Sequence, residues 1–137
     1  MTITEMELRL DEIARGLGVR IMPDIRGELY PEDIGAWLPR SRRILYRLGM
    51  RYPETMCTIA HELGHAYYGD GVVEDHLRDA RQESRADRWA AGILISADAY
   101  RQAEAIVGSH PGALAAELGV TVEFVHIWRK SHERIFS

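Results

Sequence analysis

The sequence predicts an α+β protein in which a helix and a small sheet precede a run of further helices. Three observations lead to this class. Residues 4–17 place apolar side chains at helical spacing, and prolines divide residues 19–50 into short segments. From residue 53 onward, long stretches show helical periodicity with few breaks. Strand-like and helical parts are therefore separated along the chain, as is typical of α+β proteins.

The N-terminal part predicts one helix followed by short strands. The apolar residues of 4–17 are Met6, Leu10, Ile13 and Leu17, and glycines at 16 and 18 close this helix. Strands are expected in the proline-punctuated segments VRIMPD, ELYPEDIGAWLP and RRILYRLGM. Residues 43–48 show the clearest alternation. One face of this strand carries Arg43, Leu45 and Arg47, and the other carries Ile44, Tyr46 and Leu48.

The C-terminal part predicts five helices. Pro53 suits the first turn of a helix that is expected to run to about Tyr68 and to end at the GDG sequence of residues 69–71. The remaining helices are expected at about 79–95, 97–107, 111–118 and 122–133.

The stretch CTIAHELGHAYYGD, residues 57–70, contains a His-Glu-x-x-His pattern. Residues four apart on a helix lie about 40° from each other around its axis, so the imidazoles of His61 and His65 can reach one ion. Glu62 lies at the side of that face, where it can act as general base on a metal-bound water. The alternative is an ordinary solvated helix face. Gly64 favours the first reading, since a mid-helix glycine indicates close packing.

A catalytic zinc needs a third protein ligand, and the helix at 79–95 offers two acids in the sequence QESRADRWA. Glu83 is the candidate ligand, and Asp87, one turn later, can accept a hydrogen bond from a ligand histidine. His76 is an alternative third ligand. A competing interpretation pairs the two acids with Arg81, Arg85 or Arg88 on a solvated face.

HELGH at 61–65, followed by E-x-x-A-D-x-W-A-A-x-x-L at 83–94, resembles the ImmA/IrrE family of metallopeptidases. The resemblance covers about residues 43–96. It implies a zincin-like core in which His61, His65 and Glu83 bind one Zn2+ per chain and Glu62 is the catalytic base. It also implies a peptidase-like domain over 1–97 and a C-terminal helical segment over 98–137 packed on it.

Two positions depart from the family pattern. Relatives often have a proline closing the second motif helix, where this chain has Ser96, and a second acid where it has Arg85. The first departure affects only the helix stop. The second removes a competing ligand and so favours Glu83.

The resemblance further implies a cytoplasmic zinc endopeptidase, of phage or mobile-element type, that cleaves a specific regulatory protein such as a DNA-binding repressor. Two other hypotheses about the function remain open. One is a DNA-binding regulator whose zinc site is structural, and the other is a metal-dependent module that sequesters a repressor without cutting it. Glu62 discriminates between them, because a structural zinc site has no use for an acid beside its ligand.

Groups that bind substrate or stabilise an oxyanion are less well defined. The candidate oxyanion donors are Tyr67, Tyr68, His76, Arg78 and His110. Zinc peptidases commonly bind substrate along an exposed strand edge, which suggests the strand 43–48. Arg43 and Arg47 would then favour an acidic or extended polar segment, unless they are simply solvated.

Residues 114–128, LAAELGVTVEFVHIW, have the spacing of a helix-turn-helix unit, with Ala115, Gly119 and Val125 at its key positions. Its second helix is expected to expose Thr121, Glu123, Phe124, His126, Arg129 and Lys130. Only the far end of this helix is basic, and Glu123 opposes phosphate. The sequence therefore favours a packing unit, with core side chains from Phe124, Val125, Ile127 and Trp128, over DNA contact.

Composition and charge fit a cytoplasmic protein with no membrane role. The 137 residues carry a net charge of −4, which does not attract nucleic acid or anionic membrane. The N-terminus has no apolar region of a signal peptide, and the longest apolar run, WAAGILI at 89–95, is far too short to span a bilayer. The single cysteine, Cys57, fits a reducing compartment and is expected to be a small buried residue.

Overall fold

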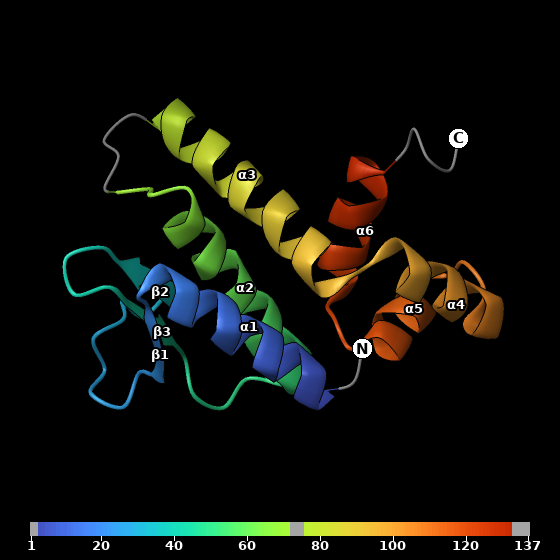
Figure 1. Cartoon of the computed structure of the whole chain (residues 1–137), viewed down its shortest axis with the longest axis horizontal. Coiled ribbons are helices and arrows are strands. Elements are labelled where there is room, and N and C mark those ends of the chain that lie inside the picture. Colours follow the sequence, from blue (N-terminus) through green and yellow to red (C-terminus); the bar gives the residue numbers. More distant parts are fainter. Residues whose placement is uncertain (1–2, 72–75, 133–137) are drawn as a thin grey trace.

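The computed structural model describes residues 3–71 and 76–132, including their side chains except those of residues 3, 4 and 76–78. Within these ranges six helices and a sheet of three short strands confirm the α+β class (Figure 1). The elements are α1 (Ile3–Leu17), β1 (Arg20–Pro23), β2 (Gly35–Leu38), β3 (Arg43–Tyr46), α2 (Tyr52–Tyr67), α3 (His76–Leu94), α4 (Ala97–Val107), α5 (Pro111–Leu118) and α6 (Val122–Ser131).

The predicted helix boundaries agree closely with those of the structure, because local capping determines most of them. Ser96 ends the preceding helix by capping α4, since its hydroxyl accepts a hydrogen bond from the backbone N–H of Ala99 at 3.0 Å. Ser96 therefore ends the helix at the position where relatives often have a proline. The largest difference is at α3, which begins at His76 rather than at residue 79.

The sheet has the order β1-β3-β2, with β1 parallel and β2 antiparallel to β3. The expectation that strand 43–48 offers an edge to substrate is therefore wrong, because both edges of β3 are already paired. Its alternation was also misleading, since Ile44 and Leu45 are both buried. The outer strand beside the HExxH helix is β2, whose other edge is unpaired among the described residues.

The two arginines of the 43–48 stretch are engaged with loops of the protein itself. The Arg43 guanidinium forms an ion pair with Glu28 at 3.1 Å. Arg47 donates to the backbone carbonyls of three loop residues, Tyr30, Pro31 and Asp33. Both residues therefore stabilise the segment between β1 and β2.

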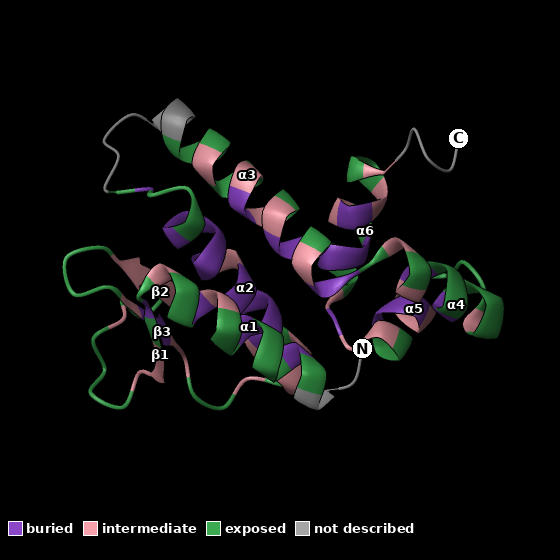
Figure 2. Ribbon diagram, in the orientation of Figure 1, coloured by how far each residue is buried: buried purple, intermediate pink, exposed green. Residues whose placement is uncertain are grey.

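One hydrophobic core runs through the helices and reaches the sheet (Figure 2). Helix α1 contributes Met6 and Leu10 on its buried face. Trp128 of α6 is 1% exposed, stacks on Tyr100 with ring centroids 4.4 Å apart, and donates its indole N–H to the Ile95 carbonyl at 2.8 Å. None of the helices in the described part of the chain is long and apolar enough to cross a membrane.

Helices α5 and α6 form the helix-turn-helix-like unit expected from the sequence, and the unit packs into the core. Gly119 takes a left-handed conformation (φ 73°) in the turn, and Ala115 and Val125 are buried at the contact. Phe124 is also buried, as the packing interpretation predicts. The Arg129 side chain donates to the Tyr100 hydroxyl at 2.7 Å, so it too supports the fold.

Candidate metal centre

Helices α2 and α3 approach each other closely at Gly64. A Cβ at this position would lie 3.0 Å from both the Cα and the carbonyl oxygen of Ala86. Ala86 itself is fully buried. Glycine opposite alanine lets the two backbones come together, as the mid-helix glycine predicted, and this brings the acids flanking Ala86 over the histidines flanking Gly64.

Three side chains from these helices converge on one point. The Nε2 atoms of His61 and His65 lie 3.2 Å apart, and they lie 2.9 and 2.8 Å from the two carboxylate oxygens of Glu83. One donor atom from each residue can be chosen so that all three lie within 4.8 Å of one another. Two imidazole nitrogens and one carboxylate oxygen are a donor set typical of catalytic zinc.

Each histidine is oriented by a second carboxylate. The Nδ1 atom of His61 lies 2.7 Å from an oxygen of Asp87, and that of His65 lies 2.9 Å from an oxygen of Asp70. An Nδ1–H that donates to a carboxylate leaves the Nε2 lone pair free for a metal ion. The donor set and its orientation therefore fit a divalent metal.

The role of Asp70 was not apparent from the sequence, in which the GDG motif only suggested the end of a helix. Asp70 is 6% exposed and forms a second ion pair, at 2.6 Å, with Arg85 of α3. The Arg85 guanidinium also lies over the ring of Tyr68, 4.2 Å from its centroid. An acid in the turn after the helix, five residues beyond the second histidine, is the only signal in the sequence, because its partner depends on tertiary packing.

The alternative in which Glu83 and Asp87 pair with neighbouring arginines is wrong. Arg85 pairs with Asp70, and Arg88 donates to the Ser84 hydroxyl at 2.7 Å. Both acids instead face the histidines of α2.

The acids and imidazoles of the centre shift one another's pKa values. Burial opposes charge on both histidines, but hydrogen bonds to the carboxylates outweigh it and raise the pKa of His61 to about 10 and that of His65 as well. Hydrogen bonds from these two histidines lower the pKa of Glu83 well below its usual range.

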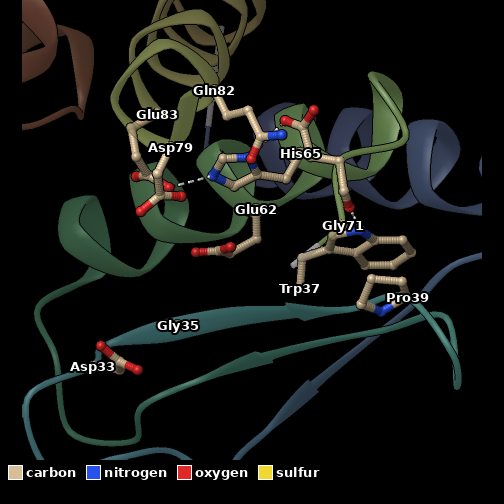
Figure 3. A pocket seen from close by; sticks show the side chains of 11 residues that line it. Asp33, Gly35, Trp37, Pro39, Glu62, His65, Gly71, Asp79, Gln82 and Glu83 are labelled. Carbon is tan, nitrogen blue, oxygen red and sulfur yellow. Dashed lines mark hydrogen bonds and ion pairs between the residues drawn. The ribbon is translucent and has the colours of Figure 1, made fainter. Parts of the chain in front are cut away.

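Glu62 lies beside the centre and is held differently. Glu62 is 9% exposed as a residue. Its carboxylate accepts no hydrogen bond from the described residues and points into the space between α3 and β2 (Figure 3). Burial raises its pKa above the ordinary value. A buried carboxylate with a raised pKa, next to an open space, is suited to taking up and releasing a proton.

Two cavities open on either side of Glu62 and Glu83. The cavity on the side of His65 has a volume of about 400 Å³ and is bounded by Trp37 and Asp70. The cavity on the side of His61 has a volume of about 440 Å³ and extends to Phe124 of α6. Both include Gly35 of β2, so the two cavities form one cleft along the outer strand with the metal centre near its middle.

Several predicted substrate residues lie away from this cleft. Tyr67 is half exposed and stacks on Trp89, with ring centroids 5.2 Å apart. His110 caps α5 by accepting hydrogen bonds from backbone N–H groups of its first turn. The side chains of His76 and Arg78 lie outside those that the structure describes, so their predicted roles, like the oxyanion donor itself, stay predictions.

Cys57 is buried, as expected. Its thiol is 4% exposed, and burial raises its pKa to about 11. The thiol sulfur accepts a hydrogen bond from the Thr121 hydroxyl at 3.7 Å. A neutral thiol of this kind packs between α2 and α6 and is a poor metal ligand.

Comparison with known families supports the motif-based resemblance. A peptidase family model, described as the IrrE N-terminal-like domain, matches residues 14–127. A comparison with curated proteins finds no match. The matched range includes both motif helices, the sheet and most of the C-terminal helices. The chain therefore belongs to the IrrE N-terminal-like family of metallopeptidases.

Proposed function

We propose that the chain is a zinc-dependent endopeptidase that hydrolyses one peptide bond in a specific regulatory protein, in particular a DNA-binding repressor. The observation that carries the proposal is the convergence of His61, His65 and Glu83 on one point, with the unpaired carboxylate of Glu62 beside it. The family supports a metallopeptidase in general.

The three converging residues would hold the ion, with one nitrogen from each histidine and one oxygen from Glu83. Bound zinc supplies a Lewis acid that brings the pKa of water near neutrality and polarises a carbonyl group. Asp87 and Asp70 keep the two imidazoles in the tautomer that such binding requires.

Glu62 is the proton carrier of the proposed reaction. Its carboxylate accepts a proton from the attacking water, whose oxygen forms the new bond to the peptide carbonyl carbon. As the C–N bond breaks, Glu62 returns this proton to the departing amine nitrogen. The burial that raises its pKa helps the group to hold the proton between these two steps.

The position of strand β2 supports the proposal that an extended substrate peptide binds along this strand. Its outer edge is unpaired among the described residues, and Gly35 of this strand lines both cavities. An extended substrate can pair with such an edge through backbone hydrogen bonds. Gly35 is required at the start of this strand, because a Cβ there would lie 2.5 Å from the Thr58 side chain and 3.4 Å from that of Glu62.

The test separates metal binding from catalysis. We expect Glu83→Ala to lose zinc, measured as metal per chain after dialysis, because only two ligands remain. Glu62→Gln should retain zinc and lose peptide cleavage, since the amide cannot carry the proton. Glu104→Ala, which removes an exposed acid of α4, is the control and should change neither property.

Either of two results would contradict the proposal. Full zinc content in Glu83→Ala would remove Glu83 from the ligand set. Undiminished cleavage by Glu62→Gln would exclude Glu62 as the proton carrier. A protein that binds zinc and the substrate but never cuts it would instead be the sequestering module considered above.

A further inference from the structure

The cleft around the metal centre is strongly acidic. Nine of the chain's 21 acidic residues line its two cavities, whereas none of the described lysines or arginines does. The nine acids are Glu32, Asp33, Glu54, Glu62, Asp70, Asp79, Glu83, Asp87 and Glu123. The chain as a whole is only mildly acidic, at −4, so this concentration is a property of the cleft.

Five of these acids are not neutralised from within the protein. Glu83 and Asp87 face His61, and Asp70 faces His65 and Arg85. Glu62 is the proposed proton carrier. The other five form no ion pair with a described cation: Glu32, Asp33, Glu54, Asp79 and Glu123.

Helix stabilisation accounts for only some of these charges. Glu54, Asp79 and Glu123 lie in the first turns of α2, α3 and α6, where an acid interacts favourably with the helix dipole. Glu32 and Asp33 lie in the loop before β2, and no helix explains them. These two acids lie just before β2 in the chain and line the cavities beside it.

The five acids come from four separate parts of the chain and line the same cleft. Glu32, Glu54 and Glu123 border the cavity on the side of His61, Asp79 borders the other, and Asp33 borders both. Charges gathered in a partly desolvated cleft act more strongly on a ligand than the same charges on an open surface. An acidic peptide would meet repulsion along the whole cleft.

We propose that the substrate segment is basic, with lysine or arginine on both sides of the scissile bond and the larger share on the side of His61. This inference rests on the proposed peptidase function and names the chemistry of its substrate. It replaces the acidic segment expected from Arg43 and Arg47, because those side chains are engaged with Glu28 and with backbone carbonyls.

The cavity on the side of His61 also suits the long stems of basic side chains. Ile34 and Phe124 line it together with the acids. Lysine and arginine bury their methylene stems against apolar surface while the charged end reaches an acid. A small neutral or acidic residue would gain from neither the apolar surface nor the acids of this cavity.

Binding measurements test the inference without relying on catalysis. The protein is Glu62→Gln loaded with zinc, and the probes are two labelled peptides of alternating alanine and lysine or alanine and glutamate. We expect the lysine peptide to bind at least about tenfold more tightly, with an affinity that falls as salt rises. Equal affinity, tighter binding of the glutamate peptide, or no binding of the lysine peptide would overturn the inference.

A matched pair of variants assigns the effect to the cleft. In the Glu62→Gln background, adding Glu32→Gln, Glu54→Gln and Glu123→Gln should weaken binding of the lysine peptide by roughly two- to threefold for each charge removed. The control removes the same charge from exposed acids outside both cavities, through Glu12→Gln, Glu104→Gln and Glu117→Gln. If the control weakens binding as much, net charge and not the cleft is responsible, and the inference fails.

Cleavage by the wild-type protein keeps the two proposals apart. If the lysine peptide binds but is not cut, the endopeptidase proposal is weakened and the basic specificity stands. If both peptides are cut equally well, the specificity is wrong and the peptidase proposal stands.

Discussion

The contact between Gly64 and Ala86 allows the most direct test of how the metal centre is built. An alanine at position 64 would place its Cβ 3.0–3.1 Å from the Cα, carbonyl oxygen and Cβ of Ala86. Carbon atoms prefer a separation of about 3.5–4.0 Å, so α2 and α3 must move apart by roughly 0.5 Å. Such overpacking costs about 1–3 kcal/mol, whereas the gain in helix propensity is at most about 1 kcal/mol.

We therefore expect Gly64→Ala to lower the free energy of unfolding, despite its better helix propensity. Gly92→Ala is the matched control, because Gly92 is an exposed glycine of α3 with nothing within 4 Å of its added Cβ. The control should gain about 0.5–1 kcal/mol. The difference between the two variants in urea unfolding isolates the steric effect, since the propensity term cancels.

The same shift should weaken zinc binding. Metal–ligand distances tolerate changes of only about 0.2 Å, and the expected displacement of α3 carries Glu83 and Asp87 with it. Competition with a chelator should show zinc affinity reduced by about tenfold in Gly64→Ala and unchanged in Gly92→Ala. The reasoning is refuted if Gly64→Ala stabilises the protein as much as the control and binds zinc equally well.

Three further predictions concern the centre and its surroundings. Asp70→Ala should weaken zinc binding by about 10- to 100-fold in the same chelator assay, because His65 loses its orienting partner; an unchanged affinity would contradict this. In the metal-free protein, the pKa of His61 is raised to about 10, so its contribution to stability is fully present below the unfolded value of about 6.5 and is lost as the pH rises through 10. Thermal unfolding of chelator-treated protein should show this decline between those values, and a flat profile would exclude it. Cys57 should react with a thiol reagent only on unfolding, since burial raises its pKa to about 11, and rapid modification of the native protein would disprove the burial argument.

Local signals predicted most of the secondary structure because they depend on near neighbours in the chain. Helical spacing, Pro53 and the glycine turns located the helices to within a few residues. The same reasoning failed for strand 43–48. The alternation of its residues implied one solvent-exposed face and an exposed edge. This strand is instead the central one, with both edges paired, and the order in which strands pair is not a local property of the sequence.

The candidate centre shows the same division at the level of single residues. His61 and His65 could be paired from sequence because a helix places residues four apart on one face. Asp70 could not be assigned, since its partners His65 and Arg85 meet only when α3 folds back over α2. Arg85 stands where relatives often have an acid, and its ion pair with Asp70 is visible only in the folded structure.

The fold class, the family and the residues able to meet at one ion can be predicted from the amino-acid sequence, because each follows from motif and periodicity. Which strand borders the cleft, which acids orient the histidines and what charge a substrate meets become visible only in the folded chain. Those features arise from elements far apart in the chain that pack together. The charge of the cleft, to which α6 and the loop before β2 both contribute, has no counterpart in any single stretch of sequence.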